Sequence, residues 1–103
     1  MKTIIDQKRY DTDTSERVGK WSNYCSYSDF NHCEETLYRT KAGAFFLHGK
    51  GGALSPYASI YGRSFYEGER MVPISIEAAR DWCEKREQTD VLELLFGDTI
   101  TDA

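Results

Sequence analysis

A chain of 103 residues has the length of one domain, and its 40% hydrophobic and 29% charged residues argue against disorder. The formal net charge is −4, and residues 77–103 alone carry eight acids against three bases. This acidic segment argues against a free nucleic-acid binder; it suits either docking onto a basic surface of another protein or a solvated helix face.

The N-terminal third predicts short strands. Residues 3–5 and 8–10 form two of them, turning at 6–7, and a polar turn at 11–15 leads to a third strand at 16–22. No early segment combines a basic start with an apolar run of signal-peptide length, and no apolar stretch approaches the roughly 20 residues that span a bilayer. With an odd number of cysteines, we expect a protein of the cell interior with reduced thiols.

Aromatic residues recur at every third position after this strand, at Trp21, Tyr24, Tyr27 and Phe30. A period of three fits neither a strand nor an α-helix, so an irregular loop or a 3₁₀ turn is predicted. Its rings either anchor the loop to the core or form an exposed recognition patch. Compact loops favour anchoring, which is our expectation.

The middle of the chain predicts a hairpin of residues 36–40 and 44–48, with Gly43 in its turn. A corner at 49–54 follows. Ser55 then has the character of a helix N-cap before Pro56, which predicts a short helix over 57–61 that ends at Gly62.

The C-terminal third predicts a loop at 63–68, a strand over 69–73 and a helix over 76–86 that Ser75 caps. Thr89 has the character of an N-cap for a last short helix that stops at Gly97. The fold class is therefore α+β: an antiparallel sheet of four to five strands, a short helix after the central hairpin and a helical C-terminus packed on the sheet. We expect one domain over residues 1–97 and a loose tail over 98–103.

The glycine corner is a candidate anion site. Glycines allow close backbone approach to a ligand, and a helix start favours negative charge. The spacing matches neither a phosphate-binding Walker loop nor a dinucleotide fingerprint, and a sharp turn would need the same glycines. The candidate residues are His48, Gly49, Lys50, Gly51, Gly52 and Ser55.

Metal and catalytic motifs are weak. Cys25, His32, Cys33 and His48 are suitable zinc ligands, but their spacing matches no zinc finger or ribbon, and Cys83 fits the buried side of its helix. No nucleophile or metalloprotease motif is present. We therefore predict no enzyme activity and no cofactor, and a zinc-stabilised adaptor is only the third hypothesis for the function.

Three stretches carry a resemblance to a known family. They are "KRYDTDTSERVGKWSN" (8–23), "ETLYRTKAGAFFLHGKGGALSPYA" (35–58) and "MVPISIEAARDWCEK" (71–85). Together they resemble a scattered family of small proteins from phages and other bacterial mobile elements, mostly of unassigned function. The resemblance covers most of residues 8–85, and the chain departs from the family pattern at 65–66 and in the tyrosine-rich loop.

The resemblance implies a small protein that acts in the bacterial cytoplasm. In that setting, short acidic proteins are often inhibitors of host defence, anti-CRISPR proteins among them, which is an argument from context. The leading hypothesis is an inhibitor that binds a basic groove of a defence complex, with no free nucleic acid and no membrane as partner. A binder of a nucleotide or another phosphate compound at 49–52 is the alternative. The candidate partner-binding residues are Tyr24, Tyr27, Tyr66, Glu77, Asp81, Glu84 and Glu87.

Overall fold

The computed structural model describes all residues, 1–103. Its strands are β1 (Lys2–Ile5), β2 (Lys8–Asp11), β3 (Glu16–Ser22), β4 (Cys33–Arg39), β5 (Phe45–Gly51), β6 (Ser59–Tyr61), β7 (Ser64–Tyr66) and β8 (Gly68–Ile74). The helices are α1 (Ile76–Lys85) and α2 (Thr89–Phe96), and a 3₁₀ turn, η1 (Gly97–Thr99), follows. The predicted α+β class is confirmed.

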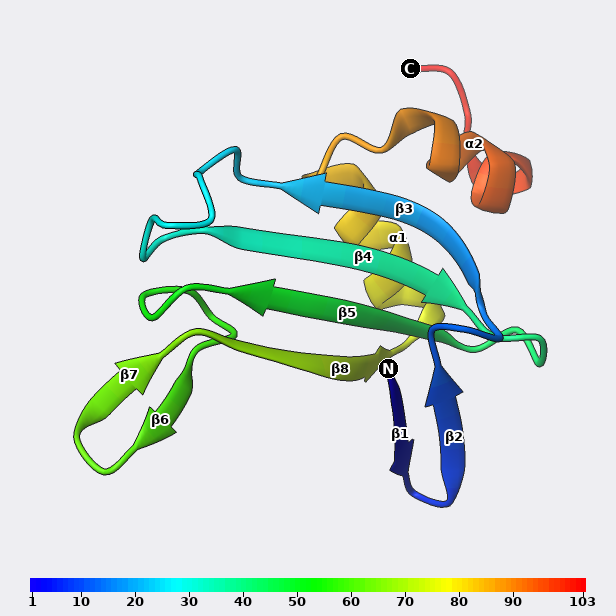
Figure 1. Cartoon of the computed structure of the whole chain (residues 1–103). Coiled ribbons are helices and arrows are strands. Elements are labelled where there is room, and N and C mark those ends of the chain that lie inside the picture. Colours follow the sequence, from blue (N-terminus) through cyan, green and yellow to red (C-terminus); the bar gives the residue numbers. More distant parts are fainter.

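One antiparallel sheet of four strands, in the order β3-β4-β5-β8, forms the body of the molecule. Two further hairpins, β1–β2 and β6–β7, pair only within themselves and project from the β8 side of the sheet (Figure 1). The predicted strands near residues 3–10 are therefore confirmed, but they form a separate hairpin outside the main sheet.

The central β4–β5 hairpin forms where its sequence predicts it. Gly43 has a φ of 90°, which suits glycine because a side chain is strained there. The Thr40 backbone closes the turn by donating to the Ala44 carbonyl, and the Thr40 hydroxyl accepts from the Ala44 amide.

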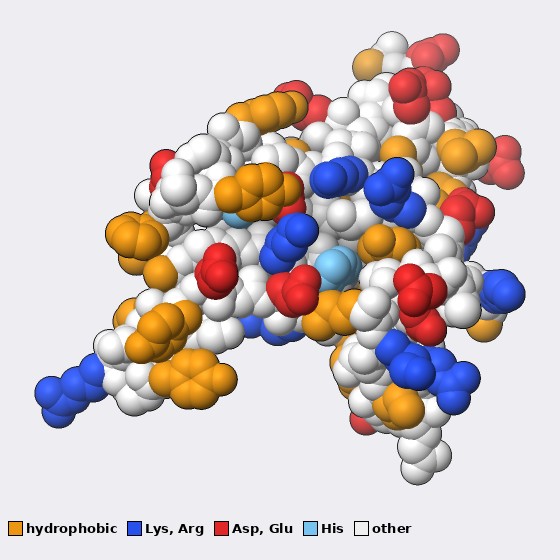
Figure 2. Space-filling view, viewed as in Figure 1, with side chains coloured by type: hydrophobic (Ala, Val, Ile, Leu, Met, Phe, Trp, Pro, Cys, Tyr) orange, Lys and Arg blue, Asp and Glu red, His pale blue; other side chains and the backbone are white.

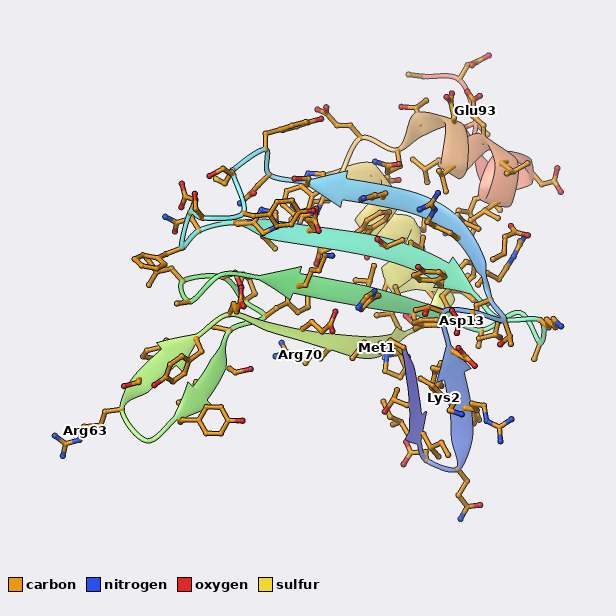
Figure 3. All side chains as sticks on the ribbon, viewed as in Figure 1. Met1, Lys2, Asp13, Arg63, Arg70 and Glu93 are labelled. Carbon is orange, nitrogen blue, oxygen red and sulfur yellow. The ribbon has the colours of Figure 1, made fainter.

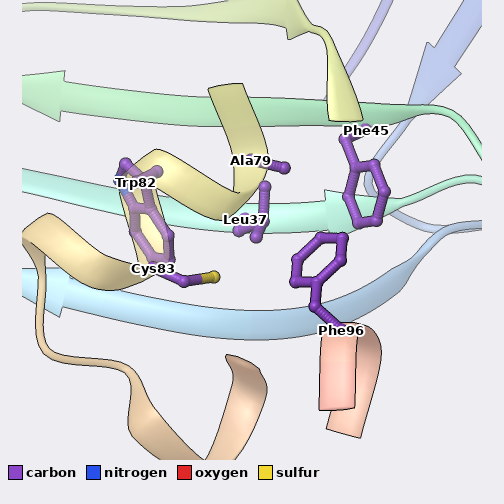
Figure 4. Packing of buried hydrophobic residues seen from close by; sticks show 6 residues of the cluster. All are labelled: Leu37, Phe45, Ala79, Trp82, Cys83 and Phe96. Atoms are coloured by element: carbon purple, nitrogen blue, oxygen red, sulfur yellow. The ribbon is translucent and has the colours of Figure 1, made fainter. Parts of the chain in front are cut away.

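The two helices cover one face of the sheet. The Ser75 hydroxyl accepts from the Ala78 amide and so caps α1, as predicted. The helix buries Ala79, Trp82 and Cys83 against the sheet, and Phe96 at the end of α2 completes the cluster (Figure 4). The cluster consists of Leu37, Phe45, Ala79, Trp82, Cys83 and Phe96.

The opposite face of the sheet buries a smaller cluster. The Phe46 ring stacks on Tyr38 and meets Tyr10 edge-on, with Met71 beside them. Tyr10 belongs to β2, so this contact holds the β1–β2 hairpin to the sheet. Beside this cluster, the middle of the same face carries charged side chains and a histidine (Figure 2).

The predicted short helix over 57–61 is wrong. Ser55 does not cap a helix: its hydroxyl donates to the Gly52 carbonyl and accepts from the Tyr57 amide, which makes a turn. Residues 59–61 then pair with 64–66 across Gly62, whose φ is 61°. A five-residue helix gains too little from its few hydrogen bonds to compete with this pairing of β-rich segments.

The predicted glycine corner is also wrong, because β5 continues through Gly51. At the C-terminal end, α2 begins at Thr89, but its N-cap is Gln88, whose side chain donates to the Lys20 carbonyl. The tail predicted as loose over 98–103 starts inside η1, and residues 100–103 form no helix or strand.

Candidate functional site

Large apolar side chains are exposed at one end of the molecule, where β5 ends and β8 begins. They belong to the 23–32 loop, to Leu54 and to the β6–β7 hairpin, and Figure 2 shows them along the left-hand side. We call this surface the aromatic end; it consists of Tyr24, Tyr27, Phe30, Leu54, Ile60, Tyr61, Phe65 and Tyr66.

The predicted anchoring of the loop by its rings is therefore wrong for Tyr24 and Phe30. Tyr24 is 94% exposed, and Tyr27 and Phe30 are also exposed; only Trp21, inside β3, packs on the core. Polar contacts hold the loop instead. The Asn23 side chain donates to the Asn31 carbonyl, and its oxygen accepts from the amides of Cys25 and Cys33. The rings of Tyr24 and Phe30 consequently face solvent, whereas the Tyr27 hydroxyl donates to Glu34 and the Tyr27 ring lies against His32.

The β6–β7 hairpin carries apolar side chains on both of its faces. Ile60 and Phe65 are directly paired and share one face, and on the other Tyr61 meets Tyr66 edge-on with ring centroids 5.9 Å apart. Arg63 marks the tip of the hairpin in Figure 3. A two-stranded ribbon is marginal in water on its own, and burial of its faces would stabilise it. Both faces of this ribbon therefore expose apolar side chains.

An apolar hollow of about 230 Å³ separates the hairpin from the loop. Tyr27 and Phe30 line it from the loop, and Phe65 and Tyr66 line it from the hairpin. Pockets that bind a side chain or a small ligand are typically concave and lined by aromatic side chains, as this hollow is.

A polar pocket of about 310 Å³ adjoins this hollow and shares Tyr27, Gly52 and Glu67 with it. Its other charged or polar lining residues are His32, Lys50 and Glu69. The neighbouring carboxylate of Glu34 accepts from the Tyr27 hydroxyl at 3.0 Å and lies 3.4 Å from the Lys50 ammonium. Burial raises the pKa of Glu34, but these two partners outweigh it, so its pKa lies below the ordinary value.

Of the six candidate anion residues, His48 and Lys50 have ionisable side chains, and both already have a carboxylate partner. His48 lies 2.9 Å from Glu69, and Lys50 pairs with Glu34. The strand-to-helix corner on which the anion prediction rested does not exist. Carboxylates outnumber the lysine around the pocket, which disfavours a phosphate.

The glycines of this stretch are explained by close packing. A Cβ on Gly49 would lie 1.9 Å from the Tyr57 ring, and one on Gly51 would collide with the Ser55 hydroxyl. A Cβ on Gly52 would lie 2.6 Å from the Phe30 carbonyl. Because these glycines have no side chains, the 23–32 loop and the Tyr57 ring can pack directly against the backbone at the end of β5.

The buried carboxylate of Glu35, on the helix-covered face of the sheet, links β4 to α1 and to the segment after β5 through hydrogen bonds. Glu35 accepts from the Tyr57 hydroxyl, from Trp82 Nε1 at 3.0 Å, and from Arg86 Nε and Nη2 at 3.0 and 2.8 Å. The Arg86 guanidinium also lies over the Trp21 ring, 3.5 Å from its centroid. Burial raises the pKa of Glu35, but these donors outweigh it and hold the pKa below its ordinary value.

The predicted acidic residues lie elsewhere. Glu77, Asp81 and Glu84 are exposed on α1, which crosses the sheet on the face turned away in Figure 1, and Glu87 is exposed just after the helix. The structure thus brings Tyr27 and Tyr66 together at the hollow, with Tyr24 in the same loop. It does not bring Glu77 to this end, since α1 starts where β8 finishes.

The candidate metal ligands are dispersed. His32 Nδ1 bonds to the Cys25 carbonyl, and Cys33 and Cys83 are buried free thiols. No group of three or more His, Cys, Asp or Glu side chains is arranged to hold a metal ion. No helix is long and apolar enough to cross a membrane.

Comparison with protein families, with curated proteins and with solved structures finds no match to the chain.

Sequence reasoning missed Phe65, Ile60 and Glu67 as parts of the site. A signal was present: β-rich triplets flank Gly62-Arg63, and glycine at the first of two turn positions is typical of a tight hairpin. The Ser55-Pro56 pair favours a helix start and so competes with this signal in the sequence.

Proposed function

We propose that the chain is a non-enzymatic protein that binds a protein partner through the aromatic end. The observation that carries the proposal is the exposure of eight large apolar side chains on one loop and one projecting hairpin. An apolar patch this concentrated is costly in water unless a partner covers it, and aromatic residues dominate interface energetics.

Charge indicates the character of the partner. Asp29 and Glu67 lie among the rings of the hollow, and the chain as a whole carries a net charge of −4. Acidic residues around apolar anchors on this chain are complementary to a partner surface that is basic and has accessible apolar residues. Surfaces that bind nucleic acid have this character.

The resemblance of residues 8–85 to mobile-element proteins supplies the class of target. We propose that the partner is a host-defence complex, with a CRISPR effector first among the targets, and that binding occludes its nucleic-acid-binding surface. Inhibition by occlusion requires no catalytic group on this chain, only a stable interface.

The experiment is capture of purified CRISPR effectors by the immobilised chain. The double variant Phe65→Ser/Tyr66→Ser removes two rings of the hollow. Because a central aromatic anchor contributes on the order of 2 kcal/mol or more, we expect a loss of affinity of about thirtyfold for each ring and on the order of a thousandfold for the pair. The matched control is Leu94→Ser on α2, which removes a side chain that is 77% exposed and lies outside the aromatic end. Equal loss in both variants, or in neither, would contradict the proposal.

A second pair of variants separates the two acidic surfaces. Asp29→Lys/Glu67→Lys reverses charge at the aromatic end, and Asp81→Lys/Glu84→Lys reverses it on α1. We expect the first pair to slow association and the second to have little effect, with the difference shrinking as salt rises. A larger effect from the α1 pair would move the interface to the helix.

A further inference from the structure

The polar pocket next to the aromatic end contains a buried histidine nitrogen without a partner. The His32 side chain is 93% buried, and its Nδ1 lies 3.0 Å from the Cys25 carbonyl. A carbonyl oxygen can only accept, so Nδ1 carries the proton. In the neutral ring Nε2 is therefore a bare acceptor, and nothing donates to it. An unsatisfied buried acceptor of this kind costs free energy that a donor would recover.

The surrounding charges favour a cationic donor. Glu67 and Glu69 line the pocket, and Glu34 Oε2 lies 3.9 Å from His32 Nε2. Lys50 is the one lysine or arginine in the lining, and it is already paired with Glu34. Glu69 is paired with His48, but none of the chain's ion pairs involves Glu67. One carboxylate and one nitrogen acceptor are thus left over in the same pocket.

We propose that this pocket binds the guanidinium group of an arginine from the protein partner. A guanidinium is planar and has five N–H donors, so it can serve the Glu67 carboxylate and His32 Nε2 together, whereas an ammonium is a compact point charge. The Tyr27 ring is 73% exposed and lies tilted against His32, with ring centroids 4.5 Å apart and planes 48° apart; it is the neighbour that moves aside to uncover Nε2. The polar pocket and the apolar hollow share lining residues, so a single segment of the partner can fill both of them.

This inference rests on the proposed function for the origin of the arginine, but the pocket can be tested without any partner. N-acetyl-arginine amide is titrated into the ¹⁵N-labelled chain at pH 8. We expect saturable binding with a Kd on the order of 1 mM and a shift of the His32 Nε2 resonance towards that of a hydrogen-bonded nitrogen. N-acetyl-citrulline amide, a neutral near-isostere, should bind at least tenfold more weakly. Glu67→Gln should lose most of the binding.

The control is Glu93→Gln, on α2 at the opposite side of the molecule from the β6–β7 hairpin (Figure 3), which should bind as the unmodified chain does. Citrulline or lysine amide binding as tightly as arginine would overturn the assignment, as would inorganic phosphate perturbing His32 instead. If arginine fails to bind while Phe65→Ser/Tyr66→Ser still abolishes capture, only this inference fails. If arginine binds but no effector is captured, only the proposed function fails.

Discussion

Replacement of Glu35 by alanine should destabilise the fold more than almost any other single polar change. Its carboxylate is 10% exposed and receives four hydrogen bonds from three side chains, one of them the guanidinium of Arg86. Removing one partner of a buried ion pair costs about 3–5 kcal/mol, because the remaining charge and donors lose their acceptor. A domain of this length has about 5–15 kcal/mol of stability in total.

The loss is measurable in two ways. For a domain of about 100 residues, each kcal/mol lowers Tm by roughly 4–8 °C, so Glu35→Ala should lower Tm by at least about 12 °C. Urea unfolding should be followed by far-UV circular dichroism, because both tryptophans, Trp21 and Trp82, contact Arg86 or Glu35 and their fluorescence will change with the variant.

Two further variants make this test specific. Glu35→Gln keeps one oxygen acceptor for Trp82 and Arg86, removes the charge and replaces the oxygen that accepts from Tyr57 by an amide nitrogen, so we expect a smaller loss of about 1.5–3 kcal/mol. Glu84→Ala removes an exposed acid on α1 and should change stability by less than about 0.5 kcal/mol. A loss below about 1 kcal/mol for Glu35→Ala would refute the structural role given to this carboxylate.

Three other predictions concern packing, acid and thiols. Gly49→Ala should cost about 3 kcal/mol or more, because the ring over it must move, whereas Gly97→Ala, with nothing within 4 Å, should be neutral in the same thermal melts. Folding lowers the pKa of Glu35, so the ionised carboxylate stabilises the fold above its unfolded pKa, near 4.3, and this stabilisation is lost as the pH falls through the folded pKa. The free energy of unfolding should therefore fall less steeply with decreasing pH in Glu35→Gln than in the unmodified chain. Parallel curves of unfolding free energy against pH would be contrary evidence. Cys25 should react with Ellman's reagent in the native state, whereas Cys83, fully buried and with its pKa raised by burial, should react only on unfolding; equal rates would contradict the burial.

The elements that the sequence predicts correctly are those with local signals. The β4–β5 hairpin has a glycine where the turn needs a positive φ, and α1 has a serine cap three residues before the amide it serves. Such contacts span few residues, so pattern and propensity suffice to find them.

The sequence predictions fail where contacts between residues far apart in the chain determine the structure. The glycines of β5 are needed because Tyr57 and the 23–32 loop press on the strand, which no local pattern reveals. The burial of Glu35 depends on hydrogen bonds from Trp82 and Arg86. These donors lie 47 and 51 residues away in the sequence, so no local pattern predicts them. An aromatic period of three gives no indication of which side of the loop faces solvent, so anchors and exposed rings look alike in sequence.

The central claim, that the aromatic end binds a nucleic-acid-handling partner, is tested most directly by DNA binding of a captured CRISPR effector. The unmodified chain and Leu94→Ser should reduce the effector's DNA binding equally, and Phe65→Ser/Tyr66→Ser, with unchanged Tm, should leave it intact. Equal inhibition by the double variant would contradict the claim, because the rings would then contribute nothing to the interface.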